Sequence, residues 1–228
     1  MSGADAIPSD LEVADLGVAD LDAIAALHVA AFPQSELTFL GHEAVRRHYR
    51  WQFEGPHELT ALGAWSEGAL VGFLLGGVFR GSTSGFVKRE RWFLARQVLR
   101  RPSLLVRSSG RRMVAVAGRL VVRRSDSSPE QPERVPAGSF GVLVVAVDPE
   151  AHRRGVGTSL LQAAEERARA GGFSRLHLTL HPGNVAALSF YTDLGWLRLG
   201  LPGDDARQWL VGKELRPVAP GGDLGEAR

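Results

Sequence analysis

The stretch from Phe140 to Arg167 reads FGVLVVAVDPEAHRRGVGTSLLQAAEER. Its first eight residues are an apolar run that predicts a buried strand, and Asp148-Pro149 ends that strand. A turn with two glycines follows, and the apolar residues after it recur at helical spacing. A strand that leads through such a turn into a helix presents free backbone amides and the positive end of the helix dipole to an anion. The stretch therefore predicts a phosphate-binding turn.

The composition is that of one ordinary globular domain. The chain has 228 residues, of which 44% are hydrophobic, and a formal net charge of +2. It has no cysteine, which excludes disulfides, thiolate metal sites and cysteine nucleophiles. The first ten residues lack the basic start and apolar run of a secretion signal, and no segment approaches the length of a membrane-spanning helix. The histidines show no metal-ligand spacing. We therefore expect a cytoplasmic enzyme or binding protein without a metal.

The remaining elements follow from apolar periodicity and turn residues. Besides 140–147, strands are predicted at 11–14, 59–65, 70–78, 175–180, 196–201 and 208–214. Besides the helix after Gly157, helices are predicted at 20–32, 41–53 and 184–194, with a loop at 34–39. Glu67-Gly68 predicts a tight hairpin between the second and third strands. We expect a flexible start at 1–10, a single domain at 11–216 and a disordered tail at 217–228.

Basic side chains are concentrated in one segment. From Arg80 to Arg124 there are thirteen Lys or Arg and one acid, Glu90. Residues 86–99 and 104–122 predict two basic helices between the third and fourth strands, after a flexible turn at 81–85 and before a linker at 125–136. This insertion, 80–138 with its linker, could dock on an anionic membrane surface, hold an anionic acceptor, pair with another subunit, or only cover its own core with solvated arginines. It carries no recognised nucleic-acid motif.

A second motif lies downstream, where Asn184 to Trp196 reads NVAALSFYTDLGW. In this order and separation, the two motifs make the chain resemble the GNAT family of N-acetyltransferases. The resemblance covers 11–215 in element order, and its most specific part is 142–196. It implies an α/β fold with a central mixed, twisted sheet flanked by helices. It also implies an acyltransferase that uses acetyl-CoA as co-substrate.

The resemblance places the acetyl-CoA site in the opening stretch. The pyrophosphate would be cradled by the backbone amides of Arg153, Arg154, Gly155, Val156, Gly157 and Thr158. Main-chain groups of Val145, Ala146 and Val147 would contact the pantetheine arm and the thioester carbonyl. Asn184 would contact the cofactor or cap the helix that follows it. The family usually has Gln or Arg where this chain has His152, and we expect binding to survive because backbone amides make most of the contacts.

The resemblance also implies catalytic residues. Tyr191 matches the family tyrosine that protonates the leaving thiolate, with packing under the last helix as the alternative and Phe190 as the expected core residue. The general base stays open. Thr179 takes the place of a glutamate found in members that acetylate ribosomal protein, and threonine cannot serve as that base. Glu36, in the loop before the second helix, and His181, after a strand, are the two candidates.

We therefore predict an acetyl-CoA-dependent N-acetyltransferase that acts by direct attack of a primary amine of a small molecule or amino sugar. A protein or peptide N-acetyltransferase and a non-catalytic acyl-CoA-binding module are the alternatives. The expected partner is the small-molecule amine, and a homodimer is a further possibility.

Overall fold

The computed structural model describes residues 10–100, 138–199 and 208–215. Within these ranges one sheet has the strand order β1-β2-β3-β4-β5-β7-β6. Neighbouring strands pair antiparallel except β4 and β5, which are parallel. The strands are β1 (Glu12–Asp15), β2 (Glu58–Ser66), β3 (Ala69–Val78), β4 (Ser139–Val147), β5 (Arg175–Leu180), β6 (Leu197–Arg198) and β7 (Trp209–Glu214). The predicted mixed sheet is confirmed.

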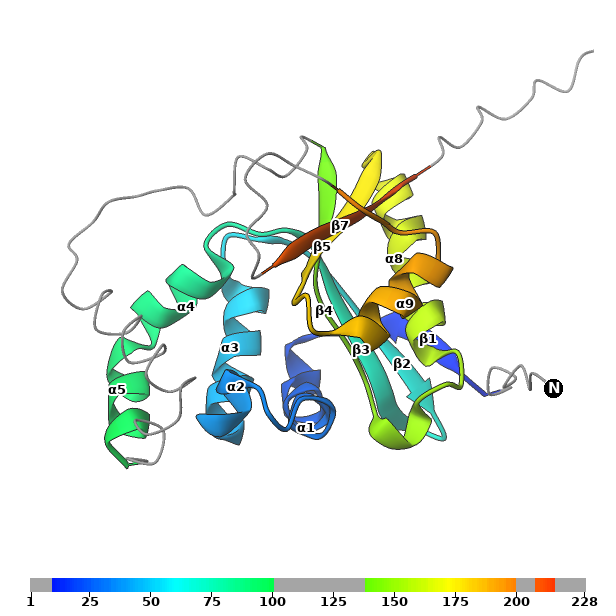
Figure 1. Ribbon diagram of the computed structural model, residues 1–228. Helices are drawn as coiled ribbons and strands as arrows, with labels where there is room; N and C mark the ends of the chain where they lie inside the picture. The colour runs from blue at the N-terminus through cyan, green and yellow to red at the C-terminus, as the bar shows by residue number, and fades with distance from the viewer. Residues whose placement is uncertain (1–9, 101–137, 200–207, 216–228) are drawn as a thin grey trace, which may run out of the picture.

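Helices cover both faces of the sheet (Figure 1). On one face α8 (Val156–Ala170) and α9 (Val185–Asp193) enclose an apolar core with side chains from β2 to β5 and β7. On the other face α1 (Leu21–Ala31) and α3 (His42–Glu54) enclose a second core. The strand residues of this second core come from β2, β3 and β4, and none of its described members belongs to β5. The helical cover on the α1–α3 face therefore stops at β4.

The hairpin between β2 and β3 forms as predicted. Glu67 and Gly68 both have left-handed backbones, with φ values of 51° and 76°. Two consecutive left-handed residues make the turn whose twist matches that of paired antiparallel strands. The resulting register pairs Ser66 with Ala69 at the turn and Glu58 with Val78 at the far end.

Two predicted loops are wrong because they contain short helices. The loop expected at 34–39 holds α2 (Glu36–Phe39), and Ser35 caps it by accepting a hydrogen bond from the Thr38 amide at 3.0 Å. The turn expected at 81–85 is mostly the first part of α4 (Ser82–Arg89). A Cβ at Gly85 would lie 2.3 Å from the Trp51 ring, so this glycine serves close packing rather than flexibility.

The rest of the basic insertion is only partly described. A further helix, α5 (Arg91–Arg100), follows α4, so the predicted helix at 86–99 is divided at Glu90. The helix predicted at 104–122 and the linker at 125–136 lie outside the described residues. So do the expected tail at 217–228, nearly all of the expected flexible start, and the end of the strand predicted at 196–201. Two short 3-10 helices, η1 (Val18–Asp20) and η2 (Pro149–Ala151), complete the described elements.

The feature that positions the site is a divergence of β4 from β5. These two strands pair only from Ser139 to Gly141 on β4 and from Arg175 to His177 on β5. Beyond Gly141, β4 continues beside β3 alone, and β5 continues beside β7. The register of β3 with β4 is irregular at the same level, between Leu75 and Gly76. One edge of β4 is therefore left without a strand partner in the described part of the sheet.

Candidate active site

The turn between β4 and α8 is held in a conformation that suits an anion. The Asp148 carboxylate accepts a hydrogen bond from the Glu150 amide at 2.8 Å and starts the turn. Arg153 and Gly155 then have left-handed backbones, with φ values of 62° and 76°. A left-handed arginine is strained, and such residues cluster at functional sites. Left-handed residues in a tight turn direct neighbouring amides into one concavity that binds anions.

The amides at the start of α8 are free for such an anion. The first hydrogen bond of this helix runs from the Ser159 amide to the Gly155 carbonyl at 2.9 Å. The amides before Ser159 therefore have no partner within the helix. The side chains of Arg153 and Arg154 are exposed, so they can add charge around the same point. The predicted phosphate turn thus has the geometry of an anion-binding cradle.

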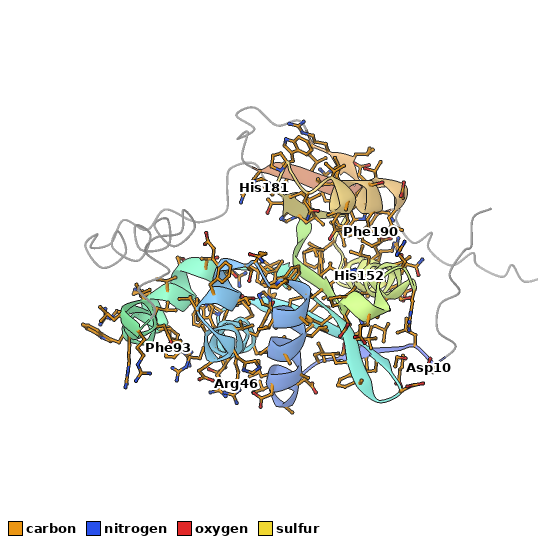
Figure 2. The ribbon with its side chains drawn as sticks, turned by 60° about the horizontal axis from the view of Figure 1, so that its bottom comes forward. Asp10, Arg46, Phe93, His152, His181 and Phe190 are labelled. Carbon is orange, nitrogen blue, oxygen red and sulfur yellow. The ribbon has the colours of Figure 1, made fainter. Side chains whose placement is uncertain are left out.

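Gly157 joins three segments of the site. A Cβ at this position would lie 3.2 Å from Cζ of Phe190 and 3.7 Å from Cγ2 of Val147. The end of β4, the start of α8 and the middle of α9 therefore meet at Gly157. In Figure 2, His152 and Phe190 lie on the same side of the molecule.

The free edge of β4 presents main-chain groups in alternation. The Asp148 amide donates to the Val71 carbonyl of β3 at 2.9 Å, so the main-chain groups of Ala146 point toward β3 as well. Those of Val145 and Val147 then point to the edge that β5 leaves open. His152 donates through Nε2 to the Val147 carbonyl at 3.2 Å. Val145 is therefore the best placed of the three predicted strand residues to contact a ligand through both of its main-chain groups.

Tyr191 lies in the core on the α8–α9 face of the sheet. Its side chain is buried, and its ring centroid is 5.2 Å from that of Phe190 and 5.4 Å from that of Trp196. Burial raises the pKa of its phenol to about 12, so the hydroxyl keeps its proton at neutral pH. Phe190, the expected core residue, is only partly buried. The burial of the two aromatic residues is thus the reverse of the expectation.

Asn184 begins α9 as a helix cap. Its side-chain carbonyl accepts a hydrogen bond from the Ala187 amide at 3.2 Å, and the residue is exposed. The cap occupies the acceptor oxygen and leaves the side-chain amide group as a donor. Capping and contact with a cofactor are therefore compatible.

The two candidate bases have different surroundings. Glu36 is exposed in the first turn of α2, and no hydrogen bond or ion pair of its side chain is recorded among the described residues. His181 is exposed, and its Nδ1 accepts a hydrogen bond from the Gly183 amide at 3.1 Å. That bond favours the neutral tautomer that carries its proton on Nε2. Neither side chain has a recorded contact with the residues of the anion cradle in the described parts of the chain.

His177 is a candidate that the sequence reasoning missed. It pairs with Gly141, the last β4 residue that β5 contacts, and its ring lies 3.2–3.3 Å from where a Gly141 Cβ would stand. Its Nδ1 is buried and has no hydrogen-bond partner among the described residues, and burial lowers its pKa below the usual 6.5. Strand alternation puts it on the same face as Thr179, and this pattern could have identified it.

A buried hydrogen-bond chain supports α2. Ser35 donates to Thr38 Oγ1 at 2.8 Å, so its oxygen accepts from His28 Nε2 at 3.2 Å, and His28 Nδ1 accepts from the Tyr49 hydroxyl at 2.7 Å. Thr38 in turn donates to the Phe32 carbonyl at 2.8 Å. Burial lowers the pKa of His28 to about 4 and raises that of Tyr49. The chain therefore joins α1 and α3 to α2 through a neutral imidazole.

Comparison with known proteins identifies the class. The model of the acetyltransferase (GNAT) family matches residues 21–196, so the chain belongs to this family. It is an acyltransferase that uses acetyl-CoA. A search of curated protein sequences finds no match.

Solved structures of the same fold are distant in sequence. The PaiA N-acetyltransferase of Thermoplasma acidophilum, in complex with coenzyme A, is 16% identical with a TM-score of 0.53, over 90% of this chain and 98% of that one. The ribosomal-protein-S18-alanine N-acetyltransferase of Escherichia coli is 15% identical with a TM-score of 0.52, over 94% and 99%. The ribosomal-protein-alanine N-acetyltransferase of Brucella melitensis is 18% identical with a TM-score of 0.52, over 90% and 99%. These likenesses show the fold.

Two searches of the described residues give negative findings. None of the helices in the described ranges is both long and apolar enough to cross a membrane. No group of three or more His, Cys, Asp or Glu side chains in those ranges could hold a metal ion.

Proposed function

We propose that this chain transfers an acetyl group from acetyl-CoA to a primary amine of a small molecule or amino sugar, by direct attack of the amine. The observation that carries the proposal is the meeting of three segments at Gly157, where Val147 at the end of β4, the start of α8, and Phe190 of α9, the residue before Tyr191, lie close together. Bound acetyl-CoA supplies the acetyl group as an activated thioester. The remaining chemistry belongs to residues of the chain.

On the donor side the roles follow from position. The cradle amides and the exposed guanidinium groups of Arg153 and Arg154 bind phosphate oxygens. The Val145 amide, at the free edge of β4, donates to the thioester carbonyl oxygen and stabilises the negative charge that develops there. Tyr191 donates its phenolic proton to the departing sulfur, and its raised pKa ensures that the proton is present.

On the acceptor side a base must take a proton from the ammonium group. Glu36 and His177 are the two candidates that we carry forward. His177 lies where β4 and β5 diverge, on the face where helical cover stops, and its burial favours the neutral imidazole that can accept a proton. Glu36 stands on α2, which the His28 chain holds in place.

The choice of a small acceptor rests on Thr179. This threonine, exposed on β5, replaces the glutamate of family members that acetylate ribosomal protein. Protein or peptide amines remain the second candidate, since two of the similar structures are enzymes named for ribosomal-protein alanine. We also propose that residues 11–216 form one domain with the insertion at 80–138, and that the enzyme works in the cytoplasm.

The test is release of free CoA, measured with a thiol reagent. Because the chain has no cysteine, the protein itself contributes no signal. We expect release from acetyl-CoA to depend on an added small amine, and Tyr191→Phe to slow turnover by about 100-fold or more. Release only with peptide amines would move the assignment to the second candidate. Stabilisation by acetyl-CoA without turnover on any amine would instead identify a binding module.

A further inference from the structure

Helix α5 has two apolar faces, and only one of them is packed. On the inner face, Leu94 is buried and Phe93 and Val98 are partly buried, in a cluster with residues of α3 and α4. On the outer face, Trp92 is 77% exposed and Leu99 is 82% exposed. These two side chains are seven residues apart, which is two helical turns, so they lie on one side of the helix about 10 Å apart.

The inner face fixes α5 on the body of the protein. The Arg47 guanidinium of α3 lies 4.2 Å from the centroid of the Phe93 ring and donates to Glu90 and Glu43, each at 2.7 Å. These contacts hold the inner face of α5 against α3, so its outer face points away from α3. They also pair Glu90 and Glu43 with Arg47, so these two acids do not neutralise the outer face.

The outer face carries positive charge around its apolar side chains. Arg91, Arg96 and Arg100 are exposed on α5, and Lys88 is exposed on α4. None of these four has a recorded ion pair within the described ranges. The α4–α5 segment from 82 to 100 has five Lys or Arg and one acid. An apolar strip between exposed arginines complements a surface with negative charge outside and hydrocarbon beneath.

We infer that the outer face of α5 docks the protein on an anionic phospholipid surface, with Trp92 and Leu99 entering the interface and the arginines at the headgroups. A basic amphipathic helix binds membranes in this way, and long arginine side chains reach the headgroups while their stems stay in the apolar layer. Helix α5 lies at the edge of the molecule, and its Phe93 is far from His152 and Phe190 (Figures 1 and 2). The proposed acetyl-CoA site therefore stays accessible when this face is docked. The inference does not depend on the proposed acetyl transfer.

The test uses the full chain and sedimentation with vesicles of phosphatidylcholine, with or without phosphatidylglycerol. We expect binding only to the anionic vesicles, and weaker binding at high salt. The double variants Trp92→Ser/Leu99→Ser and Arg96→Glu/Arg100→Glu should each lower the partition coefficient by about tenfold or more. Leu197→Ser on β6, where Leu197 is 67% exposed, and Arg167→Glu on α8 are matched controls that should bind like the wild type.

A local signal separates insertion from general attraction. The chain has five tryptophans, so the fluorescence difference between wild type and Trp92→Phe isolates Trp92. We expect this difference to shift to shorter wavelength when anionic vesicles are added. Equal binding to both vesicle types, no dependence on Trp92 and Leu99, or no shift would overturn the inference. A dimer in sedimentation velocity that Leu99→Ser dissociates would also overturn it, because the face would then be a subunit contact.

Discussion

The donor side and the acceptor side of the opening between β4 and β5 use different kinds of chemical group. In the proposed mechanism most donor-side contacts come from the main chain, namely the amides before Ser159 and the free edge at Val145, with Tyr191 as the catalytic side chain. The proposed acceptor-side groups are side chains, His177 and Glu36, the latter on a short helix held by a partly buried hydrogen-bond chain. A main-chain site should tolerate most side-chain changes and fail when the backbone moves. A side-chain site should fail when a single functional group is lost.

The largest effect should come from removing the base on the acceptor side. We expect His177→Gln or Glu36→Gln, whichever removes the base, to lower kcat by about 100-fold or more, because general base catalysis contributes that much. With His177 as the base, wild-type activity falls as the pH drops through the lowered pKa of its imidazole, since the ring must be neutral. The measurement is kcat against pH for both variants. Full activity in both would place the base on another residue.

Moving the backbone of the donor side should have the next largest effect. Gly157→Val places a branched side chain against Phe190 and Val147, whose atoms lie 3.2 and 3.7 Å from the new Cβ, so we expect α9 and the start of α8 to move apart. A displacement of about 1 Å can cost roughly 100-fold in activity, and we expect a loss of about that size in kcat/KM for acetyl-CoA. Gly17→Val is the control for glycine replacement, because the Gly17 backbone is extended and an added Cβ would meet only Asp20, at 3.9 Å. A mild effect of Gly157→Val would contradict the convergence of three segments there.

The hydrogen-bond chain below α2 should affect stability and its pH dependence. His28→Gln disturbs bonds to Tyr49 and Ser35, and we expect it to lower the free energy of unfolding by about 1–3 kcal/mol at pH 7. The pKa of His28 is about 4 in the folded protein and near 6.5 when unfolded, so the unfolded chain binds more protons between these values. Stability therefore falls as the pH drops from 6.5 toward 4. Urea unfolding at pH 7 and pH 5 should show that the free energy of unfolding drops less in the variant than in the wild type. An unchanged drop would assign the pH dependence to another group such as His48, whose pKa is also lowered.

The smallest effect should come from a side chain on the donor side. His152→Gln restores a residue usual in the family and can still donate to the Val147 carbonyl. We expect the Kd for acetyl-CoA, measured by calorimetry, to change by about twofold, as for most surface substitutions. A change of tenfold or more would mean that the imidazole itself binds the coenzyme, and the contrast between main-chain and side-chain sites would weaken.

The sequence predicted the turns of the fold because tight turns constrain residue types. A left-handed position favours glycine, as at Gly155, and a hairpin of this type favours Glu67-Gly68 or similar pairs, so such features leave recognisable patterns. Strand β5 was predicted with its observed ends because its alternation is regular. The helix α2 was missed because four residues are too few to show helical periodicity. His177 was missed although strand alternation places it on the face of Thr179, because no local pattern shows that β4 and β5 diverge beside it.

The divergence of β4 from β5 also has a consequence for how the molecule opens. Antiparallel pairing joins β1 to β4 on one side and β5, β7 and β6 on the other, while the two groups share only three residue pairs. Hydrogen exchange should therefore reveal two cooperative units with the site at their boundary. A coenzyme arm that bridges this boundary would act as the missing strand contact. Its binding should slow hydrogen exchange in both units together, because a bound coenzyme would hold the two halves of the sheet to each other.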